Sequence, residues 1–123
     1  MTDIKVLVVE DEAIVALEIQ DRLISQGYRV CGIAASGEKA ITIAQSENPD
    51  LVLMDIKLKG VMNGIDTAKI LKEKLLIPSI FITAFSDENT LNQIRGFFNY
   101  EYLLKPFEEE ELNEAVIKTL KRE

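Results

Sequence analysis

The sequence contains no histidine and only one cysteine, Cys31, among its 123 residues. Without histidine the chain can form neither a Ser/His/Asp triad nor a histidine-ligated zinc site, and it cannot carry a phosphohistidine of its own. A single cysteine excludes any disulfide within the chain. Any chemistry must therefore depend on carboxylates, hydroxyls and lysines.

Positive charge and long apolar runs are also scarce. Fourteen basic residues against 21 acidic ones give a formal net charge of −7, which is the wrong sign for binding a phosphate backbone. No apolar run approaches the roughly 18 residues that a membrane helix needs, and no charged-then-apolar leader opens the chain. We expect a cytoplasmic protein with no direct contact to nucleic acid and no membrane attachment.

Length and composition fit one globular unit. A chain of 123 residues with 47% apolar side chains can bury a core of its own and leaves no room for a second domain. The sequence shows no linker, repeat or low-complexity segment. We therefore predict a single domain over residues 1–123.

Short apolar runs alternate with stretches of helical periodicity. The runs predict strands at 4–9, 29–34, 51–54, 80–83 and 102–104. The stretches between and after them predict helices at 12–26, 38–46, 65–74, from 87 onward and at 108–120. Five such alternations indicate an α/β protein, a three-layer doubly wound domain with a five-stranded parallel sheet and helices on both faces.

The sequence also indicates where some predicted helices begin and which of their residues face the core. Ser36 is predicted to cap the second helix. Ile14, Leu17 and Ile24 are expected to form the inward stripe of the first helix. In the later helices, the inward residues are expected to be Leu91, Ile94 and Phe98 in the fourth and Leu112 and Val116 in the fifth.

Polar side chains follow four of the predicted strands. They are Glu10-Asp11-Glu12 after the first, Asp55 at the end of the third, Thr83 at the end of the fourth and Lys105-Pro106 after the fifth. Because the carboxyl ends of parallel strands meet at one edge, these groups are expected to converge. Clustered carboxylates need counter-charge, and an all-oxygen ligand set favours Mg²⁺. A carboxylate beside a metal, a lysine and a hydroxyl is a plausible nucleophile toward a phosphoryl group.

Together these motifs resemble the receiver domain of two-component response regulators. The resemblance rests on the acidic pair after the first strand, Val-Leu-Met-Asp ending the third, Thr-Ala after the fourth and Lys-Pro-Phe after the fifth, and it covers about 4–120. It implies a (βα)5, flavodoxin-like fold with strand order 2-1-3-4-5. It also implies a signalling protein that catalyses only its own phosphorylation and dephosphorylation.

The resemblance assigns a role to each matching residue. Asp55 would accept a phosphoryl group from a sensor histidine kinase or a histidine phosphotransfer protein. Asp11 and Asp55 would bind Mg²⁺, with Glu10 acting through a water and Lys57 through its backbone carbonyl. Thr83 and Lys105 would each contact a phosphoryl oxygen.

A switch and two kinds of contact surface follow from the same resemblance. Thr83 and Tyr102 would couple phosphorylation to the surface formed by the fourth helix, the fifth strand and the fifth helix, through which two copies could form a homodimer. Donor docking is expected at Val15 and Ile19, which lie off the predicted inward stripe of the first helix, and at Pro106 and Phe107. Because the sequence ends soon after the fifth helix, the protein is expected either to act through contacts or to be a piece of a longer chain.

The loop after Asp55 departs from the family pattern. It is one residue longer than the commonest form and lacks the usual proline, so Gly60 and Gly64 are expected to keep it tightly turned. Phe85 stands where many members have a polar side chain. We predict that Phe85 and Lys57 flank the phosphoryl group and slow its hydrolysis.

Two other functions compete with this one. A phosphatase with an aspartyl nucleophile would need a general-acid Asp two residues after Asp55, where Lys57 stands. A scaffold that no longer accepts phosphoryl groups would have lost some of Asp11, Asp55, Thr83 and Lys105, yet all are present.

Overall fold

The computed structural model describes residues 3–58, 60–83 and 101–121. Within them the elements are β1 (Lys5–Val9), α1 (Ala13–Ser25), β2 (Arg29–Ala34), α2 (Gly37–Glu47), β3 (Leu51–Asp55), α3 (Gly64–Leu75), β4 (Ser79–Thr83), β5 (Tyr102–Leu104) and α5 (Glu109–Lys121). The predicted helix from residue 87, with Leu91, Ile94 and Phe98, lies outside the described residues. The other predicted elements are confirmed, with ends that differ by at most one residue.

The strands form one parallel sheet in the order β2-β1-β3-β4-β5. This confirms the predicted order and the doubly wound α/β class. The chain moves outward from β1 to β2, then returns across β1 to place β3, β4 and β5 on the other side. This reversal lies between β1 and β3, the point at which such folds bind ligands.

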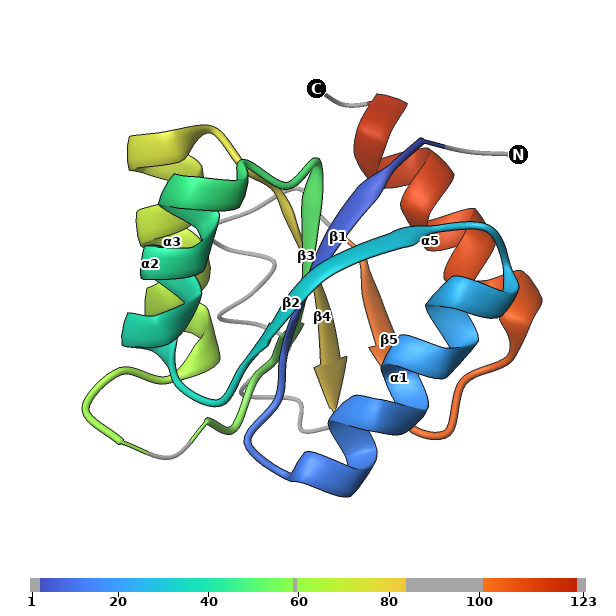
Figure 1. The fold of residues 1–123 in the computed structure, drawn as a ribbon, viewed down its shortest axis with the longest axis horizontal. Helices are drawn as coiled ribbons and strands as arrows, with labels where there is room; N and C mark the ends of the chain where they lie inside the picture. Colours follow the sequence, from blue (N-terminus) through green and yellow to red (C-terminus); the bar gives the residue numbers. More distant parts are fainter. Residues whose placement is uncertain (1–2, 59, 84–100, 122–123) are drawn as a thin grey trace.

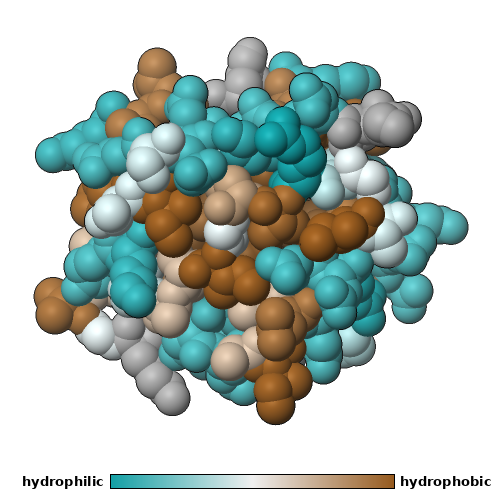
Figure 2. Space-filling view, in the orientation of Figure 1, coloured by the Kyte–Doolittle hydropathy of each residue, from teal (hydrophilic) through white to brown (hydrophobic). Residues whose placement is uncertain are grey.

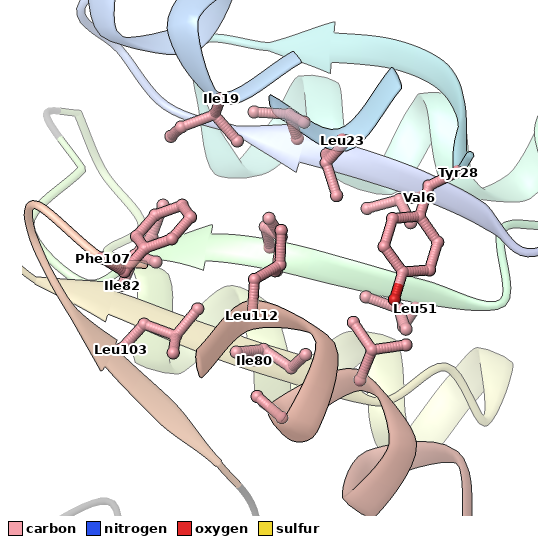
Figure 3. Close-up of a cluster of buried hydrophobic side chains, with 14 of the residues drawn as sticks. Val6, Ile19, Leu23, Tyr28, Leu51, Ile80, Ile82, Leu103, Phe107 and Leu112 are labelled. Atoms are coloured by element: carbon pink, nitrogen blue, oxygen red, sulfur yellow. The ribbon is translucent and has the colours of Figure 1, made fainter. Parts of the chain in front are cut away.

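Helices cover both faces of the sheet, and two apolar clusters fill the spaces between the layers (Figure 1). In one cluster α2 and α3 pack on the sheet through Ala40, Ala44, Ala68 and Leu71. In the other, α1 and α5 pack on the opposite face, as Figure 3 shows for Leu23 and Leu112. The central strands β1, β3 and β4 have only apolar residues between their first and last positions, as expected of strands covered on both faces.

The predicted inward face of α1 is wrong. Ile14 is 74% exposed and Leu17 and Ile24 are also exposed, whereas Ile19 is buried in the core together with Ala16 and Leu23. Both sets repeat at helical spacing, so the period alone did not distinguish them. The buried stripe of Ala16, Ile19 and Leu23 was overlooked because alanine is only weakly apolar and the exposed stripe contains larger apolar side chains.

Local signals fix the starts of the other helices. The Ser36 side chain accepts a hydrogen bond from the backbone N–H of Lys39 at 3.2 Å, which confirms the predicted cap of α2. The Asn63 side chain caps α3 in the same way, through the N–H of Asp66 at 2.9 Å. In α5, Leu112 and Val116 face the core as predicted.

The edge strand β2 is less covered than the central strands. Four of its six residues are half-buried, and apolar surface gathers in the middle of the face that Figure 2 shows. Among the described residues, no helix combines the length and the apolar character that crossing a membrane requires.

Candidate functional site

The carboxyl ends of the strands bring the predicted site residues to one edge of the sheet, at the bottom of Figure 1. Asp55 and Thr83 are the last residues of β3 and β4. Glu10 and Lys105 directly follow β1 and β5. Parallel pairing of these strands therefore brings together side chains as far apart in the sequence as Glu10 and Lys105, which are 95 residues apart and share a hydrogen bond.

Three carboxylates form a cluster there. Oxygens of Glu10, Asp11 and Asp55 lie within 4.8 Å of one another. Glu10 is 1% exposed and Asp55 is 7% exposed, whereas Asp11 is half-buried. Burying negative charge at this density requires compensation from the surrounding groups.

Lys105 supplies part of that compensation. Its ammonium donates a hydrogen bond to Glu10 Oε1 at 2.6 Å, and the other Glu10 oxygen accepts from the backbone N–H of Glu12 at 3.2 Å. The backbone N–H of Lys105 donates to the Thr83 carbonyl at 2.8 Å, which aligns the end of β5 with the end of β4. Lys105 thus holds the most buried carboxylate of the cluster.

Asp55 remains under-compensated. Burial, followed by the nearby negative charge of Glu10, raises its pKa from 3.8 to about 6, while the positive charge of Lys105 and the backbone N–H of Lys57 act in the opposite direction. That N–H lies 3.2 Å from Asp55 Oδ1. A carboxylate held in this way favours a cationic partner.

The residues present fit a divalent cation. Three carboxylate oxygens converge, and the pKa of Asp55 is raised, as expected of a pocket with excess negative charge. Oxygen-only donors suit Mg²⁺, which binds through one or two carboxylates and retains several waters. The protein would hold the ion mainly through Asp11 and Asp55, with Glu10 already engaged by Lys105.

The loop from Asp55 to α3 contains the two glycines that the sequence analysis named, and it is anchored by Leu58, which that analysis did not single out. Leu58 is buried in the core on the α2–α3 side of the sheet. Gly60 adopts a positive φ of 108°, which confirms the predicted turn. Gly64 serves another purpose, because a Cβ there would lie 2.0 Å from the Asp55 carbonyl oxygen. The only sequence signal for this role of Leu58 is its place as an apolar residue two positions before Gly60 in a loop.

The predicted switch and docking residues have different surroundings. Tyr102 is 37% exposed at the edge strand β5, and Pro106 is exposed. Phe107 and Ile19 are buried in the α1–α5 cluster, and Val15 packs against it. The prediction that Ile19 lies off the inward face is therefore wrong, because α1 turns this residue toward the sheet. Phe85, proposed to flank the phosphoryl group, lies outside the described residues.

A family model for the response regulator receiver domain matches residues 6–117. The chain belongs to this family. Receiver domains are signalling modules that imply a histidine kinase or another phosphodonor as partner.

Among curated relatives, the transcriptional regulatory protein PdtaR of Mycobacterium tuberculosis is 35% identical over 91% of this receiver domain and 54% of that protein. The alkaline phosphatase synthesis transcriptional regulatory protein PhoP of Bacillus subtilis is 35% identical over 96% of the chain and 49% of that protein. The chain therefore spans about half the length of these relatives.

A solved structure agrees closely with the fold. The signal receiver domain of a modulated diguanylate cyclase from Desulfovibrio desulfuricans G20 superposes with a TM-score of 0.90 at 32% identity, covering 98% of this chain and 96% of that one. The fold and family implied by the sequence resemblance are thereby confirmed.

Proposed function

We propose that Asp55 accepts a phosphoryl group from a phosphohistidine on a sensor histidine kinase or a histidine phosphotransfer protein. The observation that carries this proposal is the position of Asp55, buried at the end of β3 beside two further carboxylates, one of which, Glu10, accepts a hydrogen bond from the Lys105 ammonium. Donor and acceptor would meet in the cytoplasm, the compartment expected from the sequence. The chain would act on no separate substrate and would catalyse only the gain and loss of its own phosphoryl group.

The transfer is a displacement at phosphorus. An Asp55 carboxylate oxygen forms the new P–O bond as the P–N bond to the donor imidazole breaks, and the imidazole leaves with the bonding electron pair. Mg²⁺, when bound, would neutralise charge on the phosphoryl oxygens. The raised pKa of Asp55 implies that this carboxylate needs a nearby cation to remain ionised and nucleophilic at low pH.

Lys105 and Thr83 would recognise the product. Phosphorylation adds about 1.5 to 2 negative charges at one position. The Lys105 ammonium, 2.6 Å from Glu10 Oε1, would exchange this partner for a phosphoryl oxygen, while the Thr83 hydroxyl would donate to another. Backbone pairing between Thr83 and Lys105 couples their movements.

Movement of Thr83 would be transmitted to Tyr102. The two residues lie on adjacent strands, in which Thr83 is paired with Leu104 and Phe81 with Tyr102. Tyr102, exposed at this edge, would turn inward as the hydroxyl withdraws and change the surface that β5 and α5 present. A homodimer through this surface remains a prediction, since the predicted fourth helix lies outside the described residues.

Incubation with acetyl phosphate and Mg²⁺ tests the proposal. Wild-type protein should gain the mass of one phosphoryl group, and Asp55→Asn should gain none. The matched control is Asp66→Asn, which removes an exposed carboxylate from the first turn of α3 and should leave the mass gain intact. No gain by the wild type would refute the proposal, and turnover of p-nitrophenyl phosphate would favour a phosphatase instead.

A further inference from the structure

Arg22 joins α1 to the segment that follows β5. It lies in the last turn of α1, and its Nη1 donates a hydrogen bond to the backbone carbonyl of Phe107 at 2.5 Å. Its guanidinium carbon also lies 5.4 Å from the centre of the Phe107 ring. One side chain therefore holds both the backbone and the ring of the same residue.

The residue that Arg22 holds is itself fixed. The Phe107 ring is buried among side chains of α1, α5 and the sheet (Figure 3). The next residue, Glu108, donates its backbone N–H to the Glu111 carboxylate at 2.9 Å. Phe107 is thus a rigid point in the chain just before α5 begins.

Lys105 lies only two residues before this point. Its backbone is fixed on the other side by the hydrogen bond to the Thr83 carbonyl. The short segment from Lys105 to Phe107 is therefore held at both ends, by β4 and by Arg22. The reach of the Lys105 side chain therefore depends on two contacts, the backbone hydrogen bond to Thr83 and the hydrogen bond from Arg22 to Phe107.

The helix that carries Arg22 also starts at the site. α1 begins three residues after Glu10, the carboxylate that Lys105 contacts. Arg22, in the last turn of α1, thus makes a second connection between the β1–α1 segment and the segment after β5, in addition to the hydrogen bond from Lys105 to Glu10. The guanidinium shares a surface pocket with Glu108, Glu109 and Glu110, whose negative charge favours keeping it at this end of the helix.

We propose that Arg22 is a positioning residue, which sets the reach of the Lys105 ammonium toward Glu10 and toward the phosphoryl group on Asp55. The inference deepens the proposed function and depends on it for the phosphoryl part. Arginine suits the role because a charged, planar group can donate to a carbonyl and stack on an aromatic ring at once. Lysine would supply the charge without the planar stacking.

A double-mutant cycle in the full chain tests the proposal. Because small displacements of a catalytic group are costly, Arg22→Met should slow phosphorylation by acetyl phosphate about tenfold, and Arg22→Lys should recover part of the rate. In a Lys105→Met background, which retains only a residual rate, adding Arg22→Met should cause no further slowing. Arg22→Met should nevertheless lower the free energy of unfolding, measured in urea, in both the wild-type and the Lys105→Met backgrounds.

The matched control is Arg29→Met, which removes the same side chain from an exposed pair with Asp3 and should leave the rate unchanged. An unchanged rate in Arg22→Met would overturn the proposal. Equal slowing with and without Lys105 would also overturn it, because that is the result of a merely structural role.

An NMR measurement separates this inference from the proposed function. In metal-free wild-type protein, the Lys105 ammonium should give a slowly exchanging signal because it is bonded to Glu10. Arg22→Met should broaden that signal and Arg29→Met should not. If the wild type accepts no phosphoryl group, the proposed function fails and this signal alone decides whether Arg22 positions Lys105; an unaltered signal would refute it.

Discussion

At the scale of single residues, Gly64 shows how closely the start of α3 passes the backbone of Asp55. A Cβ at this position would lie 2.0 Å from the Asp55 carbonyl oxygen and 2.9 Å from the Ile56 Cα. Both are backbone atoms, so the strand end or the start of α3 would have to move. Gly64→Ala should lower the free energy of unfolding by about 2 kcal/mol and slow phosphorylation, as measured by urea denaturation and by mass gain with acetyl phosphate.

Gly32→Ala is the control for this prediction. A Cβ there would meet the flexible Ile43 side chain at 3.4 Å, an ordinary contact. A Gly64→Ala protein as stable and as active as Gly32→Ala would contradict the close approach described here.

The residue types at the strand ends were enough to predict which side chains converge at the site, but not which carboxylate forms the ion pair with Lys105. The convergence of Glu10, Asp11 and Asp55 follows from parallel strands, and the structure confirms it. The bond from Lys105 to Glu10 could not be foreseen, since three carboxylates of equal charge competed for one ammonium. Burial decided the outcome: Glu10 is the most buried of the three and therefore needs the direct partner most.

At the scale of elements, the loop between β3 and α3 depends on Leu58 as its anchor. This side chain is buried against the α2–α3 side of the core, three residues after Asp55. Leu58→Ala should lower the free energy of unfolding by about 2 to 3 kcal/mol. It should also weaken Mg²⁺ binding, because the backbone of Lys57 lies between the anchor and the cluster. Denaturation and a magnesium titration by calorimetry would measure the two effects.

Val61→Ala provides the comparison within the same loop. Val61 is 93% exposed, so its truncation should change neither stability nor Mg²⁺ affinity appreciably. Equal effects of the two substitutions would show that Leu58 does not anchor the loop.

Element types were predictable, but the orientation of α1 was not. Apolar runs and helical spacing identified every described element. Ile14, which is exposed, and Ile19, which is buried, are nevertheless both isoleucines, and each belongs to a set of apolar residues repeated at helical spacing. Which one faces inward is set by how the helix sits on β1 and β2, a tertiary property that no local pattern contains.

At the scale of the whole molecule, the carboxylate cluster links stability to pH. Unfolded, Asp55 should titrate near pH 3.9; folded, its pKa is raised to about 6. Between these values the folded state binds more protons, so the free energy of unfolding should fall as the pH rises from about 4 to 6 and stay lowered above that.

Asp55→Asn should remove the fall in the free energy of unfolding between about pH 4 and 6, because the amide does not titrate. Without Mg²⁺ at pH 7.5 the variant should be more stable than the wild type by about 1 kcal/mol, after allowance for solvent screening, and the difference should vanish near pH 4. Adding Mg²⁺ should stabilise the wild type more than the variant. Thermal unfolding at several pH values measures all three, and parallel pH profiles for the two proteins would contradict the expectation.

The positions of Ile4 and Lys121, near the two ends of the described part of the chain, bear on how the domain can be fused or immobilised. Ile4, just before β1, and Lys121, at the end of α5, line the same groove, at the edge of the sheet opposite the carboxylates (Figure 1). A purification tag or a fused domain attached at either terminus would emerge there. Such a fusion would leave the carboxylate cluster uncovered, so immobilising the protein by either end should preserve its capacity to gain a phosphoryl group.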